Sequence, residues 1–317
     1  MAYQFKSCAE LLALCNKHQV PISQIAVRRE MAISYKSRSQ VRNQMKKIRD
    51  AMWGAIRSGV ENTAKSKYGL VGGDAKKIHD SLRKMGKFLH SKVAVRAMAY
   101  AVATTEQNAR MGRIAAFPTA GGAGVVPGVL FSTSQHMKSS KRRMLRALFT
   151  ASAIGVAILE HGGTISAAKA GCQAEIGVGS AMAAAGVTEM RGGTPEQCIN
   201  AAALALKNML GLACDPLGGL VEVPCVKRNA FGVVHAIAAS DLSLMGVESF
   251  IPMDEVVEAM MTIACHMSEG IRETALGGLA ITKTGLKVRA KMGLKPVPKK
   301  YLPNKNRLEC KGCPGCV

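Results

Sequence analysis

The sequence predicts a mostly α-helical protein, and three features lead to this prediction. The 317 residues are 48% hydrophobic, so the chain is long and apolar enough to bury a sizeable core. Only 4% of the residues are aromatic, whereas 32 are glycine and 18 are methionine, which favours closely packed helices over a β-sandwich. Apolar residues also recur at helical spacing in several segments. We therefore expect a compact helical fold.

Two amphipathic helices are expected near the N-terminus, at residues 8–20 and 40–58. In the first, apolar side chains occupy positions i, i+3, i+4 and i+7, which form one face of a helix. These side chains are Cys8, Leu11, Leu12 and Cys15. A glycine-rich break at 69–73 follows, and helical periodicity resumes at 78–109. Residues 164–190, rich in alanine and glycine, should form a helix buried on all sides.

A helix start is visible at Thr194, Pro195 and Gln197, which have the order of a capping box with proline at the first helical position. This helix should run to about Leu212 and carry Cys214 at its end. Further helices are expected at 128–131, 230–245 and 254–268, whereas the basic tail from Lys287 onward should be extended.

The net charge of +22 is unevenly distributed along the chain. Residues 1–120 carry 22 Lys and Arg against 7 Asp and Glu, and residues 281–317 carry 10 against 1, but residues 171–280 carry 5 against 12. The basic flanks are interpreted either as solvated helix faces or as a docking surface for an acidic partner. No aromatic RNA-binding motif or zinc-finger spacing supports a nucleic-acid partner.

Membrane and secretory segments are not expected. No stretch reaches the roughly 18 uninterrupted apolar residues that a spanning helix needs, so no membrane span is predicted. The N-terminus lacks the pattern of a secretory signal, so the cytoplasm is the expected location. Ten cysteines in a reducing compartment are then thiols or metal ligands.

The cysteines fall into three sets by their local context. Four lie within helical periodicity and should be buried as small apolar residues. These are Cys8, Cys15, Cys198 and Cys265. Cys172, Cys214 and Cys225 instead lie at glycine or proline breaks, where three distant segments can bring their thiolates to one metal site, although their spacing fits neither a zinc ribbon nor a ferredoxin. Three more end the chain, and these are Cys310, Cys313 and Cys316.

The residues around the second set are similar to one family. The similar segments are 170–177, 193–197, 207–216, 219–229, 248–252 and 273–280, in that order. Together they resemble the α-chain of the iron-sulfur L-serine dehydratases (L-serine ammonia-lyases), and the resemblance covers roughly residues 65 to 285. It divides the chain into a basic N-terminal helical segment (1–65), an iron-sulfur catalytic helical domain (66–285) and a basic extended tail with a cysteine-rich end (286–317).

The resemblance implies a cofactor and a reaction. Cys172, Cys214 and Cys225 would hold a 4Fe-4S cluster from loops between helices, leaving one iron free to act on the substrate. The reaction would convert L-serine to pyruvate and ammonia, in amino-acid catabolism and gluconeogenesis. In some members of the family a C-terminal cysteine occupies the free iron until substrate arrives, and Cys316 is the candidate here, unless the tail forms a separate metal or redox site or an inert end.

Other residues are candidates for substrate contacts. The glycine-rich loop containing Thr119, Gly121, Gly122 and Gly124 can bring backbone N–H groups to an anion, or it is a simple turn. The family has Asn where this loop has Ala120, which puts a side-chain role in doubt but leaves a backbone role open.

Two further sets of residues have both a functional and a structural interpretation. One of Lys227, Arg228 and Asn229 would bind the substrate carboxylate; alternatively, the three residues are solvent-exposed or structural. His161 and His235 are possible bases, or structural histidines.

The resemblance also bears on the partners of the chain. Single-chain members contain a further domain with a Ser-Ser-His-Thr stretch that is missing here, which implies a separate β-subunit docked in part on the basic N-terminal portion.

Three competing hypotheses about function stay open at this point. The first is a related iron-sulfur lyase that acts on another β-substituted amino acid, such as a cysteine desulfidase. The second is a non-catalytic iron-sulfur protein that serves electron transfer or iron sensing. The third is a basic nucleic-acid-binding protein, which would bind duplexes with a strong dependence on salt.

Overall fold

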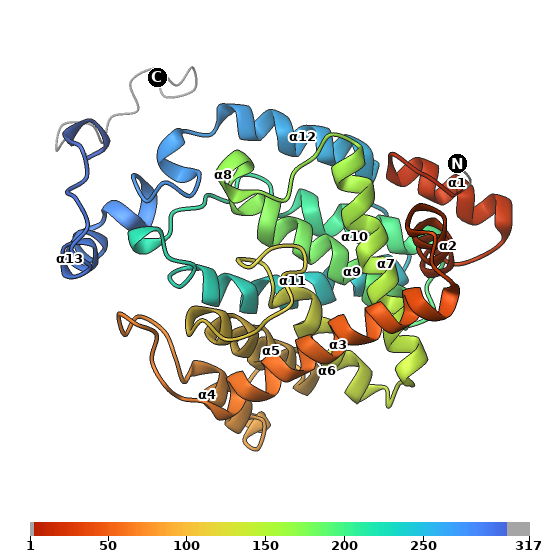
Figure 1. Cartoon of the computed structure of the whole chain (residues 1–317), viewed down its shortest axis with the longest axis horizontal. Helices are drawn as coiled ribbons and strands as arrows, with labels where there is room; N and C mark the ends of the chain where they lie inside the picture. Colours follow the sequence, from red (N-terminus) through yellow and green to blue (C-terminus); the bar gives the residue numbers. More distant parts are fainter. Residues whose placement is uncertain (1–2, 303–317) are drawn as a thin grey trace.

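A computed structural model describes residues 3–302, and within them every long element is a helix (Figure 1). The prediction of a mostly α-helical fold is confirmed, since an isolated bridge between Cys214 and Arg272 is the only β pairing in the described residues. The helices are α1 (Cys8–His18), α2 (Ile22–Ser34), α3 (Arg38–Glu61), α4 (Asp74–Ser81), α5 (Lys92–Ala109), α6 (Val125–His136), α7 (Lys141–Glu160), α8 (Ala167–Ala170), α9 (Val178–Met190), α10 (Pro195–Lys207), α11 (Cys225–Leu244), α12 (Met253–His266) and α13 (Lys283–Lys291).

Helix α9 forms the centre of the fold. All of its residues are buried, and α6, α7, α10 and α11 surround it. Small residues permit this packing: a Cβ atom on Gly186 would lie 2.8 Å from the backbone oxygen of Ala147 on α7. The alanine- and glycine-rich composition therefore brings helix backbones close together, as the sequence predicts.

The N-terminal helices share the main core with the rest of the chain. Leu11 of α1 and Ile22 of α2 belong to the same buried cluster as Leu148 of α7. The buried carboxylate of Glu189, at the end of α9, accepts hydrogen bonds from the backbone N–H and hydroxyl of Ser23 and from Arg146. A buried charge with this many partners ties α2, α7 and α9 together.

Local capping signals place several helix starts where the sequence predicts them. The hydroxyl of Thr194 accepts from the N–H of Gln197, and the Gln197 side chain accepts from the N–H of Thr194, which completes the capping box. Helices α1 and α3 match the segments expected at 8–20 and 40–58. None of the described helices is long and apolar enough to span a membrane.

Four expectations about the helices differ from the structure. The helix expected at 164–190 is interrupted, because Gly171, with a φ of 70°, separates α8 from the segment that leads into α9. The segment expected at 78–109 is broken, because α4 ends at Ser81 and Ser91 starts α5 by capping the N–H of Ala94. Helix α10 ends at Lys207, so Cys214 follows an irregular loop and not a helix end. The tail is not extended from Lys287, since α13 runs from Lys283 to Lys291.

One expected core cysteine is exposed. Cys8, Cys15 and Cys198 are buried as predicted, but Cys265 faces solvent. The buried side of α12 contains Met260 and Ala264, and Cys265 lies one residue beyond that stripe, about 100° around the helix.

Candidate functional site

The three cysteines at glycine and proline breaks come together in the structure. Cys172 lies at the start of a π-helical turn (Gln173–Gly177) that leads into α9, Cys214 lies in the loop after α10, and Cys225 is the first residue of α11. Their exposures are 1%, 2% and 4%. Only Cys214 lies in a loop between helices; the other two open helical segments, which corrects the expectation that all three ligands lie on loops.

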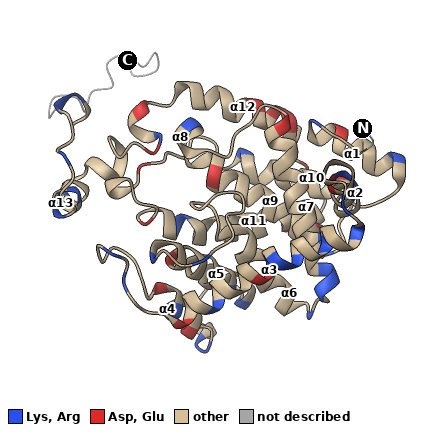
Figure 2. Cartoon of the chain, viewed as in Figure 1, with Lys and Arg blue, Asp and Glu red and all other residues tan. Residues whose placement is uncertain are grey.

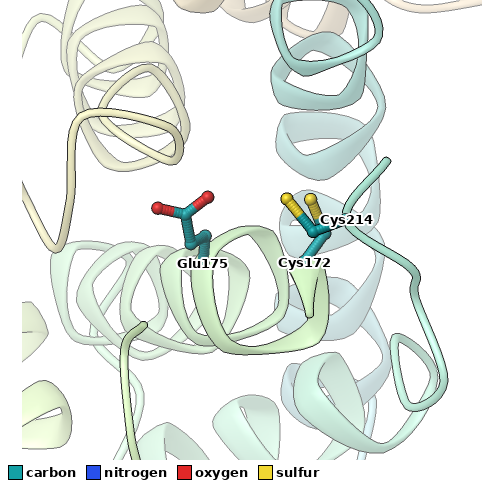
Figure 3. Close-up of side chains that lie close together, drawn as sticks. All are labelled: Cys172, Glu175 and Cys214. Carbon is teal, nitrogen blue, oxygen red and sulfur yellow. The ribbon is translucent and has the colours of Figure 1, made fainter. Parts of the chain in front are cut away.

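Two of the thiols and one carboxylate form the tightest group. The Sγ atoms of Cys172 and Cys214 and a carboxylate oxygen of Glu175 all lie within 4.8 Å of one another. Figure 3 shows the three side chains pointing to the same side, with Cys172 and Glu175 on one helical segment and Cys214 on the loop after α10. Cys225 lies outside this 4.8 Å group but interacts electrostatically with both other thiols.

Acidities of the thiols differ because their surroundings differ. A hydrogen bond from Cys214 lowers the pKa of Cys172, and the positive charge of Arg228 lowers it further. The same hydrogen bond, together with burial, raises the pKa of Cys214 far above its usual range. Burial raises the pKa of Cys225 to about 12. Without a metal, Cys172 is therefore the most readily ionised of the three.

Arg228 connects the segments that carry these thiols. Its Nη1 donates to the Sγ of Cys172 at 3.4 Å and to the backbone oxygen of Ala213 at 2.7 Å. Its Nη2 donates to Oδ1 of Asp215 at 2.9 Å. The guanidinium group thus fixes the residues on both sides of Cys214 relative to Cys172.

The glycine-rich loop lies against Glu175. Thr119 Oγ1 donates to Oε1 of Glu175 at 2.7 Å, and a Cβ atom on Gly121 would lie 2.3 Å from Oε2 of the same carboxylate. Burial raises the pKa of Glu175, the bond from Thr119 opposes this effect, and the charge of Glu273 adds to it. Among the described residues, no acceptor is found for the N–H groups of Ala120 and Gly121.

Asn229 holds this loop in place. Its side-chain nitrogen donates to the backbone oxygens of Gly121 and Cys225, and its oxygen accepts from the N–H of Gly124. Gly122 also packs closely, since a Cβ atom there would lie 2.8 Å from the Glu175 backbone oxygen. The structure therefore brings the predicted loop next to the predicted cysteines.

The other predicted site residues lie elsewhere. Lys227 is half exposed and pairs with Asp74 of α4 at 2.5 Å. His161 contacts Glu258 at 3.1 Å, and His235 contacts the backbone oxygen of Ala205 at 2.8 Å; no contact of either with the thiols is found in the described part of the chain. Cys316 and the other tail cysteines lie outside the described residues.

The sequence analysis assigned no role to residues 271–275, the segment that supports Cys214. The N–H of Cys214 donates to Ile271, and its oxygen accepts from the N–H of Glu273, both at 2.8 Å. Glu273 and Ala275 have positive φ values, a strained conformation for residues with a side chain. Glu175 was also missed, although its position three residues after Cys172 places both on one helix face.

The donor set suits a soft metal centre. Three buried sulfur ligands are typical of zinc, copper(I) or iron-sulfur sites, and metal binding would remove the thiol protons that burial retains. An arginine donating to one sulfur is the kind of outer contact that tunes such a centre. The residues present therefore fit a three-cysteine iron-sulfur cluster.

Comparisons with known proteins point to one family. A family model described as "Serine dehydratase alpha chain" matches residues 17–280. The chain is 46% identical over 288 residues to a probable L-serine dehydratase, alpha chain, of Bacillus subtilis (strain 168), covering 91% of this chain and 95% of the relative. It is 39% identical over 280 residues to the L-serine dehydratase, alpha chain, of Peptoniphilus asaccharolyticus, covering 88% and 95%.

A longer relative is matched over part of its length. The chain is 33% identical over 289 residues to L-serine dehydratase TdcG of Escherichia coli (strain K12), which covers 88% of this chain and 62% of that relative. The similarity thus spans nearly the whole length of the two relatives named alpha chains, but less than two thirds of the length of this longer relative.

Proposed function

Because the chain belongs to the serine dehydratase alpha-chain family, we propose that it dehydrates L-serine, releasing pyruvate and ammonia. Serine loses its α-proton and its hydroxyl group as water, and the resulting aminoacrylate hydrolyses to the two products. The observation that carries this proposal is the group formed by the buried thiols of Cys172 and Cys214 and the Glu175 carboxylate beside a glycine-rich loop, with the Cys225 thiol near enough to interact electrostatically. L-serine ammonia-lyase is the corresponding activity.

Cys172, Cys214 and Cys225 are the proposed ligands of a 4Fe-4S cluster. With only three protein ligands, such a cluster would supply a Lewis-acidic iron for the substrate hydroxyl group. Arg228 then serves as a positioning residue, because its donors are used by Cys172 and by the loop containing Cys214. The tail cysteine Cys316 is proposed as a temporary fourth ligand, which would occupy the open iron until serine displaces it.

The glycine-rich loop and Glu175 are the proposed contacts for the amino-acid part of serine. The N–H groups of Ala120 and Gly121, which have no acceptor among the described residues, can donate to the substrate carboxylate. The Glu175 carboxylate lies beside these groups and can accept from the substrate ammonium. This arrangement would place the β-carbon of serine toward the thiols, since Glu175 lies within 4.8 Å of two of them.

A separate β-subunit is the proposed partner, and the cytoplasm the proposed location. Relatives named alpha chains are matched over 95% of their length, which supports a two-chain enzyme. The basic N-terminal portion is the proposed part of the docking surface.

The first experiment is an anaerobic absorption spectrum and iron count of the chain, with and without its β-subunit, before and after L-serine. We expect a 4Fe-4S spectrum that serine perturbs, and pyruvate only when both subunits are present. A cluster that serine leaves unchanged would contradict the proposal. Sulfide released from cysteine, with no pyruvate from serine, would identify a desulfidase instead.

A further inference from the structure

A cavity of about 530 Å³ lies between α2, α3 and α7, away from the thiol site. Seven of its twelve lining residues are basic, and none is acidic. The basic residues are Arg38, Arg42, Lys46, Arg49, Lys141, Arg142 and Arg146. Figure 2 shows lysine and arginine gathered where these helices lie side by side.

Most of this positive charge is not balanced by nearby carboxylates. Arg49 pairs with Asp50 at 2.5 Å, and Arg146 pairs with Glu189 at 3.0 Å. The other five basic residues of the cavity form no ion pair with any described residue. Along α3 the charges at Arg42 and Lys46 are four residues apart, a spacing at which like charges repel. The arrangement is therefore unfavourable unless an anion compensates it.

The ends of two long helices increase the positive potential. Helix α3 begins at Arg38 and α7 at Lys141, and neither has an acidic residue in its first turn. The N-terminus of a helix carries a partial positive charge and favours anions. Basic residues at these positions oppose the helix dipole, so a bound anion would relieve the repulsion at both ends.

We propose that this cavity binds a small anion with two or more phosphate or carboxylate groups. Its volume lies in the range of small-molecule sites. Arginine presents paired N–H donors that match phosphate and carboxylate oxygens. The buried side chains of Val27, Leu145 and Phe149 form an apolar wall, which strengthens electrostatic attraction by excluding water. The cavity shares no residue with the thiol site, so this ligand is distinct from the amino-acid substrate.

The test is calorimetric titration of the full-length chain with pyrophosphate, and in a second arm with citrate. We expect saturable binding of one anion per chain, weakened at least about tenfold by the double variant Arg42→Gln with Lys46→Gln. The control is Lys47→Gln with Arg57→Gln, which removes the same charge from the same helix. Lys47 and Arg57 line other pockets of the surface and not this cavity. The tighter of the two ligands assigns the site to phosphates or to carboxylates.

Thermal melting provides a second measurement that is independent of titration heats. Pyrophosphate should raise the Tm of the wild type and of the control, but not of the Arg42 and Lys46 double variant. No saturable binding of either ligand at millimolar concentration would overturn the proposal. Equal weakening of binding in the control variant would also overturn the proposal. So would loss of binding when the β-subunit is added, because this result would assign the cavity to the subunit interface.

Discussion

Arg228 illustrates how one side chain organises the thiol site. Its guanidinium group donates to a sulfur, to a backbone carbonyl and to a carboxylate that in turn accepts from the N–H of Leu279. A lysine could not reach all of these acceptors, because an ammonium group lacks the planar fork of arginine.

For Arg228→Lys we therefore expect a drop in iron per chain and a fall of roughly 10- to 100-fold in the kcat/KM for serine, as is typical when the support of a metal ligand is lost. The measurements are iron content and pyruvate formation. Arg191→Lys is the control, because Arg191 pairs with Asp241 at the surface. Normal iron content in Arg228→Lys would contradict the positioning role.

Glu175 is the second residue whose role can be isolated. Glu175→Gln keeps the shape and the bond from Thr119 but removes the charge. If the carboxylate holds the substrate ammonium, the KM for serine should rise about tenfold or more while iron content stays constant. Lost iron with an unchanged KM would instead indicate a metal ligand.

At the level of secondary structure, glycine positions distinguish close packing from free helix surface. Gly186 lies at the crossing of α7 and α9, where an added Cβ atom would lie 2.8 Å from a backbone oxygen. Gly54 lies within α3, where an added Cβ atom meets no other atom within 4 Å among the described residues.

These two positions predict opposite effects of the same substitution. Gly186→Ala should lower the free energy of unfolding by about 1–3 kcal/mol, because overpacking forces the helices apart. Gly54→Ala should raise it by about 0.5–1 kcal/mol, because alanine is the better helix former. Urea unfolding monitored by circular dichroism measures both, and destabilisation by Gly54→Ala would contradict the open environment of that helix face.

At the level of the whole molecule, the charges are segregated along the chain. The basic region 1–120 includes α3, which contributes four basic residues to the cavity, whereas the acidic region 171–280 includes the segments around the thiols. Such separation favours fast association with an acidic surface and makes it dependent on salt.

If the basic portion docks the proposed β-subunit, the association rate should fall about tenfold or more between low and high ionic strength, while the dissociation rate changes little. Surface plasmon resonance at several salt concentrations measures both rates. An association rate that is independent of salt would place the interface on a less charged face.

The fold class, several helix starts and the three candidate ligand cysteines could be predicted from the sequence, whereas the long helices α2 and α7 were not predicted. These features depend on neighbouring residues: the spacing of apolar side chains, the Thr194 capping box, and glycine or proline beside Cys172 and Cys225. The burial of α9 also followed from its composition. Such signals are readable because their physical cause lies within a few residues.

Which of these residues contact one another could be learned only from the folded structure. Glu175 belongs to the site because it accepts a hydrogen bond from Thr119, and Arg228 because it donates to Asp215. Lys227 does not belong to it, because it pairs with Asp74. The wrong expectations for Cys265 and for the tail helix α13 arose in the same way. The direction of a side chain, and the packing that completes a helix, depend on segments that are far apart in the sequence and adjacent only in the folded chain.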